Sequence, residues 1–372
     1  MLLPAPAGCL CAIKDAAVSA PYAQLEGEQM QAVVIESPGD ISVGEQPDPT
    51  PGPGEIVVAV RACGICGTDI HIADGDLASA KYPLVPGHEF AGEVVAVGGP
   101  VPTVRGLAPE SDEQQLRLGD LVAVDPTLFC GRCRPCRLGH ENLCERWGAI
   151  GVTVGGGCAE LVAVPSWNAH RLPPDFDMSL GALIEPLSCA VHGYDLIKTK
   201  LGDRFIIYGA GTMGLMLLLL AERAGAVSVT VVEPNEVRRK KAAELGATEA
   251  LASVEHIDGG RRFDVVMDAT GVIAAIEDGL RRVRPGGTFL QFGVASNSAT
   301  AKVSPFKIYN EEINVVGSMA VLKSYDRACD LTTEVDLRLH ELVSGQYPLK
   351  DYAEVLERAR HGDGYKLQVV PS

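Results

Sequence analysis

The second half of the chain alternates apolar, strand-like runs with helix-like stretches, and this alternation restricts the folds open to it. The strand-like runs are residues 205–209, 229–233, 247–253, 264–270, 288–294 and 313–318. Helix-like stretches at residues 212–226 and 235–247 separate the first three runs. Nearly continuous apolar strands joined by helices are typical of a parallel sheet that is covered on both faces. We therefore expect an α/β fold with a six-stranded, doubly wound parallel sheet.

A glycine pattern marks the first turn of this sheet as a dinucleotide-binding site. Gly209, Gly211 and Gly214 form G-x-G-x-x-G directly between a strand-like run and a helix-like stretch. The first glycine permits the tight turn, the second lets a pyrophosphate approach the backbone, and the third lets the helix pack closely on the strand. Thr212 and Met213 complete the loop. This context predicts a Rossmann-type site for NAD or NADP.

Glu233, at the end of the next strand-like run, favours NAD. A carboxylate at this place accepts hydrogen bonds from the adenosine ribose hydroxyls and repels the 2′-phosphate of NADP. Arg238 and Arg239 follow closely, and a guanidinium group can bind such a phosphate, so NADP remains the alternative.

The first half, from about Met30 to Ile184, is instead a series of short strand-like runs separated by glycine and proline. These runs are residues 30–36, 55–65, 90–98, 120–124 and 159–164. They predict a compact, barrel-like β domain whose loops hold the catalytic residues. Beyond about residue 319 the pattern predicts helices over residues 326–345 and 351–360. A last strand over residues 365–370 should pack back on the first domain.

A chain of 372 residues is long for a single hydrophobic core. We expect a β-rich catalytic domain of residues 30–184 and 320–372, and a Rossmann domain of residues 185–319. Residues 1–29 are rich in alanine and proline and lack the basic start of a signal peptide, so a flexible extension is expected there. Residues 100–118 are predicted to form a polar surface insertion.

Four closely spaced cysteines predict a structural zinc site. Cys130, Cys133, Cys136 and Cys144 follow the pattern C-x2-C-x2-C-x7-C, which differs from a ferredoxin cluster run. Four thiolates fill the tetrahedral shell of zinc and leave no position for substrate. Two disulfides are the alternative, but 11 cysteines, an odd number, fit a reducing compartment better. We therefore expect a zinc lobe at residues 126–148 and a cytoplasmic protein.

A second set of metal donors lies elsewhere in the chain. Cys66, His88 and Glu89 offer sulfur, nitrogen and oxygen ligands, and Glu185 adds a carboxylate at the border of the two expected domains. A catalytic zinc keeps one position open, so three protein ligands suffice. The spacing does not determine whether Glu89 or Glu185 completes the shell. The sequence thus predicts two zinc ions per chain.

These motifs, in this order, resemble the zinc-dependent medium-chain alcohol dehydrogenase family from Met30 to the C-terminus. The resemblance implies a chaperonin-like β domain for catalysis, with the Rossmann domain inserted before its last elements. It also implies that Cys66 and His88 hold the catalytic zinc. Liver-type members have cysteine where this chain has Glu185, which points to the sorbitol, arabinitol and threonine dehydrogenase branch. In that branch Glu89 is the usual third ligand, and Glu185 is expected near the zinc-bound water.

The same resemblance implies a proton path and a mechanism. Thr68 and His71, expected in a loop that leaves the metal ligand, match the proton relay of the family. Zinc would stabilise the substrate alkoxide, hydride would pass to NAD⁺, and the proton would leave through Thr68, the cofactor ribose and His71. Phe292, Gly293 and Val294 follow the fifth strand, and their backbone is expected to hold the nicotinamide carboxamide.

The expected substrate is a small alcohol. A polyol or other secondary alcohol comes first because of Glu89 and Glu185, and because aromatic residues are only 5% of the chain, which leaves room for a polar pocket. Threonine or another amino alcohol is the alternative, and a non-catalytic dinucleotide-binding protein is the alternative of another class. A formal net charge of -16 argues against nucleic acid or an anionic membrane as partner. Family members are dimers or tetramers, so a homo-oligomer is expected.

Overall fold

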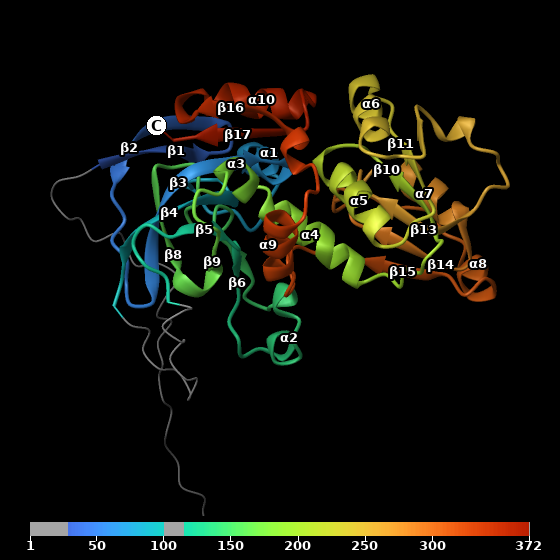
Figure 1. Cartoon of the computed structure of the whole chain (residues 1–372), viewed down its shortest axis with the longest axis horizontal. Coiled ribbons are helices and arrows are strands. Elements are labelled where there is room, and N and C mark those ends of the chain that lie inside the picture. Colours follow the sequence, from blue (N-terminus) through green and yellow to red (C-terminus); the bar gives the residue numbers. More distant parts are fainter. Residues whose placement is uncertain (1–28, 100–114, 372) are drawn as a thin grey trace, which may run out of the picture.

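The computed structural model describes residues 29–99 and 115–371 (Figure 1). All but Gln29 of the expected N-terminal extension therefore lies outside the described residues, as does most of the expected insertion at residues 100–118. A β-rich part and an α/β part lie next to each other along the long axis (Figure 1). None of the described helices is long and apolar enough to cross a membrane.

The α/β part contains a six-stranded parallel sheet, as the sequence predicted, in the order β12-β11-β10-β13-β14-β15. Its strands are β10 (Arg204–Tyr208), β11 (Ser228–Val232), β12 (Glu249–Leu251), β13 (Phe263–Asp268), β14 (Val283–Gln291) and β15 (Asn314–Gly317). Strand order reverses between β10 and β13, and ligands of such sheets bind at the carboxyl ends beside this point.

Alternate residues of β10 explain why these strands are apolar throughout. Phe205 and Ile207 belong to the core on one face of the sheet, whereas Ile206 and Tyr208 belong to the core on the other. Helices cover both faces: α5 (Thr212–Arg223), α6 (Glu236–Glu244), α7 (Ile273–Arg282) and α8 (Pro305–Asn310). The doubly wound arrangement thus buries the side chains of β10 from Phe205 to Tyr208 and all those of β13.

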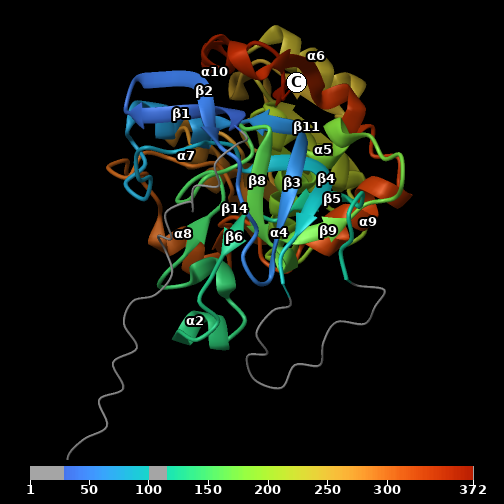
Figure 2. The ribbon, with the colours of Figure 1, turned by 90° about the vertical axis from the view of Figure 1, so that its left-hand side faces the viewer.

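The β-rich part is built on a seven-stranded sheet in the order β16-β17-β3-β4-β5-β9, with β8 also paired to β3 (Figure 2). Its strands are β3 (Glu55–Ile65), β4 (Glu89–Val97), β5 (Leu121–Val124), β8 (Leu161–Pro165), β9 (Ala169–Arg171), β16 (Val343–Pro348) and β17 (Lys366–Val370). Two short antiparallel pairs complete it: β1 (Gln29–Ser37) with β2 (Asp40–Pro47), and β6 (Thr127–Leu128) with β7 (Gly148–Ala149). All the strand-like runs expected in the first half are strands.

The C-terminal segment returns to this sheet, because β17 pairs antiparallel with β3. The helix expected over residues 326–345 is only partly correct. The helix α9 (Tyr325–Glu334) ends early, and residues 343–348 form β16 beside β17. Gly345 and Pro348 disfavour a helix there, and the open edge of β17 offers backbone hydrogen bonds instead. The second expected helix is present as α10 (Tyr352–His361).

Short helices also occur in the first half: α1 (Gly67–Asp74), α2 (Arg134–Arg137), α3 (Met178–Gly181) and α4 (Ile184–Asp195). The α4 helix lies between the two parts and contacts β4, β5, α5 and α9 (Figure 1). Thr68 and His71 lie on α1, so the loop expected for them was wrong. Cys66 and Asp69 form a capping box at the start of this helix. The Cys66 side chain accepts a hydrogen bond from the backbone N–H of Asp69, and the Asp69 side chain accepts one from the backbone N–H of Cys66.

Candidate metal and cofactor sites

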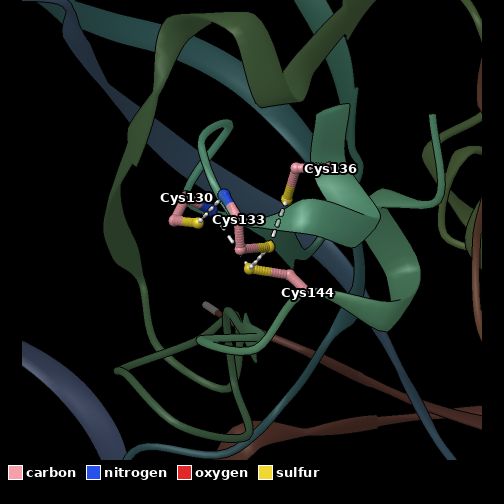
Figure 3. A group of neighbouring side chains, drawn as sticks. All are labelled: Cys130, Cys133, Cys136 and Cys144. Carbon is pink, nitrogen blue, oxygen red and sulfur yellow. Dashed lines mark hydrogen bonds between the residues drawn. The ribbon is translucent and has the colours of Figure 1, made fainter. Parts of the chain in front are cut away.

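The four cysteines of the lobe converge on one point (Figure 3). Their sulfur atoms all lie within 4.8 Å of one another. The Cys133 Sγ atom is 3.3 Å from that of Cys136 and 3.8 Å from that of Cys144. Zn–S bonds of about 2.3 Å in a tetrahedron place sulfur atoms about 3.8 Å apart. The four thiols therefore fit a single zinc ion.

The cysteines of the lobe are free thiols rather than disulfides, and their surroundings shift their pKa values in opposite directions. The nine cysteines of the described residues are all free. The backbone N–H of Cys133 points at Cys130 Sγ (3.4 Å), and backbone hydrogen bonds lower the pKa of Cys130 to about 6. Burial instead raises the pKa of Cys136 to about 12. A cation among the four sulfurs would stabilise the charged form of all of them.

Cys66 and His88 meet where β3 ends and β4 begins. Cys66 Sγ lies 3.1 Å from Nε2 of His88, a contact that suits two ligands of one ion. Cys66 is the N-cap of α1, so its sulfur faces the positive end of the helix dipole. Burial nevertheless raises the pKa of the Cys66 thiol. A metal cation would supply the charge that a thiolate needs at this buried place.

Two carboxylates lie near His88, in a donor group that does not include Cys66. Donor atoms of His88, Glu89 and Glu185 all lie within 4.8 Å of one another, and all three residues are buried. Glu185 stands in the first turn of α4. Burial raises the pKa of Glu185 to about 7, and its Oε1 accepts a hydrogen bond from the thiol of Cys189 at 3.5 Å. Sulfur, nitrogen and carboxylate oxygen are the donors expected at a catalytic zinc, so the residues fit the metal.

The sequence reasoning missed Asp69, which is fully buried beside this site. Its Oδ2 accepts the backbone N–H of Cys66 at 2.9 Å, and its Oδ1 lies 3.8 Å from Nδ1 of His88. Neither Oδ1 nor Nδ1 has a hydrogen-bond partner among the described residues. A carboxylate facing the second ring nitrogen orients a ligand histidine. The capping-box spacing between Cys66 and Asp69 was the feature that could have revealed it.

The second residue that was missed is Lys366. Its side chain is only 2% exposed, and its Nζ lies 2.5 Å from Oε2 of Glu89 and 3.1 Å from the carbonyl oxygen of Ile65. Burial opposes the charge of Lys366, but Glu89, Cys66 and Asp69 together outweigh it and raise the lysine pKa. A lysine in the mostly apolar last strand could have been noticed, because a buried charge requires a partner.

Thr68 and His71 are three residues apart on α1, so they share one side of that helix. The backbone N–H of Thr68 points at Cys66 Sγ (3.3 Å), and the Thr68 side chain is half-buried. The His71 side chain is 53% exposed, and its Nδ1 lies 4.0 Å from a carboxylate oxygen of Asp76. The two residues thus lie in order from the donor cluster to the surface.

The glycine loop has the geometry that its sequence predicted. Gly209 follows β10 with φ +94°, a value that favours glycine. A Cβ on Gly214 would lie 2.0 Å from the carbonyl oxygen of Gly209, so only glycine allows α5 to approach this closely. Gly211 is the N-cap of α5, and no other heavy atom lies within 4 Å of the place of a Cβ on this residue. Met213 packs against the core. Thr212 donates its hydroxyl to the carbonyl of Tyr365 at 2.7 Å.

Glu233 directly follows β11 and faces the same loop. Its Oε2 accepts the backbone N–H of Ala210 at 2.8 Å, and its Oε1 accepts the N–H of Asn235 at 2.8 Å. The carboxylate therefore lies at the carboxyl ends of β10 and β11, where the adenosine ribose is expected.

Arg238 and Arg239, which follow Glu233, both donate hydrogen bonds to backbone carbonyl groups. Arg238 Nη2 donates to the carbonyl of Gly362 at 3.0 Å, in the turn between α10 and β17. Arg239 Nη1 donates to the carbonyls of Glu233 and Pro234 at 3.0 and 2.9 Å. A 2′-phosphate would therefore have to compete with these contacts.

The segment Phe292, Gly293 and Val294 follows β14 at the carboxyl edge of the sheet. Gly293 N–H donates to the carbonyl of Asp268 at 2.7 Å, next to the switch point. The Phe292 ring lies 3.1 Å from the place of a Cβ on Gly193 in α4. The segment thus connects the cofactor sheet with the helix that presents Glu185, and the Val294 side chain is exposed.

Two family models match the chain. Residues 52–174 match the alcohol dehydrogenase GroES-like domain, and residues 212–334 match the zinc-binding dehydrogenase model.

Individual proteins are similar over almost the whole length. D-arabinitol dehydrogenase 1 of Uromyces fabae is 34% identical over 92% of this chain and 98% of its own. L-threonine 3-dehydrogenase of Saccharopolyspora erythraea is 33% identical over 90% of this chain and 96% of its own. A crystal structure described as a zinc-binding dehydrogenase of Sinorhizobium meliloti 1021, bound to NADP, has a TM-score of 0.84 at 35% identity. It covers 93% of this chain and 100% of that one.

Proposed function

We propose a specific activity from one premise: the chain belongs to the zinc-dependent medium-chain alcohol dehydrogenase family. It is an oxidoreductase that acts on CH–OH donors with zinc and a nicotinamide cofactor. This leaves the non-catalytic alternative without support. Within that class, we propose that the protein oxidises a polyol with NAD⁺ and catalyses the reverse reduction. The observation that supports the reaction best is the buried contact of Cys66 with His88 beside two carboxylates.

We assign the metal ligands by residue. Cys66 and His88, with a carboxylate from Glu89 or Glu185, would hold the catalytic zinc. The remaining ligand set, Cys130, Cys133, Cys136 and Cys144, would hold the structural zinc, which makes two ions per chain. When bound, the catalytic zinc supplies Lewis-acid polarisation of the substrate hydroxyl, and the nicotinamide supplies the hydride acceptor.

The residues of the chain then position and move the proton. The carboxylate of Asp69 faces Nδ1 of His88 at 3.8 Å, and a closer approach would orient the imidazole as a metal ligand. Thr68 is next to Cys66 and accepts the proton that leaves the substrate hydroxyl, and His71 passes it to solvent from the exposed side of α1. The backbone of Phe292, Gly293 and Val294 would hold the nicotinamide carboxamide, because this segment lies between the sheet and α4.

NAD is the proposed cofactor. Glu233 places a carboxylate at the end of β11, which repels a 2′-phosphate. Arg238 and Arg239 would have to give up their carbonyl partners to bind that phosphate. The similar structure bound to NADP keeps NADP as the alternative.

The polyol assignment is supported by the arabinitol dehydrogenase relative and by the buried carboxylates of Glu89 and Glu185 beside His88. The threonine dehydrogenase relative favours a second candidate, an amino alcohol, whose ammonium group could pair with a buried carboxylate. The test is a panel of D-arabinitol, sorbitol, L-threonine and ethanol with each cofactor. We expect the highest kcat/KM for a polyol with NAD⁺. Activity on threonine alone would favour the second candidate, and activity on ethanol alone would overturn both.

A homodimer or homotetramer and a cytoplasmic location also remain expectations for this protein. Size-exclusion chromatography with light scattering would test the first of them.

A further inference from the structure

The chain leaves the six-stranded sheet after β15 and enters α9 through residues 318–324, which form the crossover segment. Ala320 and Lys323 in this segment have positive φ angles of 50° and 52°. A residue with a side chain adopts this backbone conformation at a cost in free energy, and it persists where the surrounding contacts hold it. The neighbours of the crossover segment therefore determine its path.

One buried amide of the four-cysteine lobe binds the crossover segment. Asn142 lies in a short 3₁₀ helix (Glu141–Leu143) and is only 5% exposed. Its Nδ2 donates a hydrogen bond to the backbone carbonyl of Met319 at 2.9 Å. Its Oδ1 is also buried and has no hydrogen-bond partner in the part of the chain that the structure describes. The polar group of Asn142 therefore acts through its contact with Met319.

The cysteines of the lobe determine where Asn142 lies. Cys144 follows two residues later, and its backbone N–H donates to the carbonyl of Glu141 at 3.0 Å. Because Cys144 is a ligand of the proposed structural zinc, the metal ion would fix the turn that presents Asn142. A second contact joins the same elements, since Nζ of Lys323 lies 3.7 Å from Oε1 of Glu141. Lys323 is largely exposed, so this ion pair contributes little and the amide is the main link.

The crossover segment is in turn bound to the end of β14. The backbone N–H of Ser318 donates to the carbonyl of Gln291 at 3.0 Å. Gln291 Nε2 donates to the carbonyl of Gly293 and to Oδ2 of Asp268, both at 2.7 Å. Hydrogen bonds thus connect the lobe, the crossover segment and the loop that follows β14, with Ser318 and Met319 as neighbours in the chain.

We propose that Asn142 is a positioning residue for the nicotinamide half of the cofactor site, because it holds the crossover segment against the end of β14. This inference rests on the nicotinamide site proposed at residues 292–294. The adenosine half is expected elsewhere, at Glu233 and the carboxyl ends of β10 and β11. Loss of the Asn142 contact therefore weakens the binding of one half of the cofactor and leaves the other half unchanged.

Calorimetric titration of the zinc-loaded protein with NAD⁺ and with ADP-ribose, which lacks the nicotinamide, tests the proposal. In Asn142→Ala the carbonyl of Met319 loses its donor, so the crossover segment is less restrained. We expect the Kd for NAD⁺ to rise about fivefold, the effect of one hydrogen bond, and the Kd for ADP-ribose to stay unchanged. Leu138→Ala, at an exposed side chain of the same lobe, is the matched control and should bind both ligands as the wild type does. A role in folding alone would not separate the two ligands.

Asn142→Asp is a second variant of almost the same shape. A carboxylate oxygen in place of Nδ2 cannot donate to Met319, so we expect the same selective loss. Elemental analysis should give the zinc content of the wild type for both variants. Equal changes for NAD⁺ and ADP-ribose, or wild-type Kd values for both, would overturn the proposal. Loss of the lobe zinc would overturn it as well, because Asn142 would then serve the lobe alone.

Amide hydrogen exchange of the unaltered protein gives a test that needs no variant. NAD⁺ should slow exchange at the N–H of Ser318 more than ADP-ribose does, and equal protection by the two ligands would contradict the proposal. The same protein separates this inference from the proposed function. If it binds neither NAD⁺ nor NADP⁺, the proposed function fails. If it binds NAD⁺ and Asn142→Ala binds it equally well, only the role of Asn142 fails.

Discussion

The hydroxyl of Thr212 donates a hydrogen bond to the backbone carbonyl of Tyr365 at 2.7 Å, across 153 residues of sequence. Thr212 is the first residue of α5, where the pyrophosphate of the cofactor is expected. Tyr365 immediately precedes β17 and also donates its own hydroxyl to the carbonyl of Val237 at 3.3 Å. The helix proposed to bind the cofactor is therefore hydrogen-bonded to the residue that precedes the last strand of the β-rich part.

Replacing Thr212 by valine should weaken cofactor binding. A hydrogen bond of this kind contributes about 1 kcal/mol, so the Kd for NAD⁺ should rise about fivefold while the fold remains. Titration of the protein fluorescence with NAD⁺ measures the change, with Thr300→Val at an exposed site as control. An unchanged Kd would mean that the contact does not position α5 for the cofactor.

Replacing Glu233 by alanine should erode the preference for NAD⁺. The repulsion of a 2′-phosphate disappears, so the ratio of kcat/KM for NAD⁺ to that for NADP⁺ should fall at least about tenfold. Stability should fall as well, because the N–H groups of Ala210 and Asn235 lose their acceptor. Glu233→Gln keeps an acceptor and separates the two effects. A wild-type protein that prefers NADP⁺ would contradict the cofactor assignment.

Replacing Cys144 by serine should remove one of two zinc ions and leave the other. Three sulfur ligands and a weak hydroxyl no longer fill a structural shell, and structural zinc contributes directly to folding. Elemental analysis should give one zinc per chain, and the melting temperature should fall by several degrees. Cys329→Ser, at a thiol outside both donor groups, is the matched control and should retain two ions.

His192 should make the protein less stable in mild acid. Burial lowers the pKa of this imidazole below its usual value of 6.5. The unfolded chain therefore takes up a proton first as the pH falls below 6.5, and stability is lost down to the folded pKa. The loss is at most about 1.4 kcal/mol per pH unit.

Urea unfolding at pH 7.5, 6.5 and 5.5 measures this dependence. His192→Gln should show a smaller decrease between pH 6.5 and 5.5, whereas His361→Gln, at an exposed histidine, should follow the wild type. Parallel curves for the wild type and His192→Gln would contradict the expectation.

The parallel sheet could be predicted because its pattern is local. Ile206 and Ile207 are both apolar since they face opposite covered sides of one strand, and this produces a run that is visible in the sequence. The lobe cysteines and the glycine loop are likewise short segments whose geometry follows from spacing. The helix expected over residues 326–345 failed because the edge of β17, distant in sequence, takes residues 343–348 as a strand.

The site could be predicted only in part. Cys66 and His88 were recognised by residue type and order, and the structure brings them into contact. The pairing of Glu89 with Lys366 joins residues that are 277 positions apart. No periodicity links them, because the register of β17 on β3 depends on the completed sheet. Asp69 was overlooked since its role follows from the helix that starts at Cys66, where a loop was expected.

Tyr365 and Lys366 are neighbours in the chain, yet one touches the first turn of α5 and the other touches Glu89. A single peptide bond separates the residue that contacts α5 from the residue that contacts Glu89 beside the proposed metal site. We expect cofactor binding at α5 to move the backbone of Tyr365 and Lys366. The position of Glu89 beside the proposed metal site should then change when the cofactor binds.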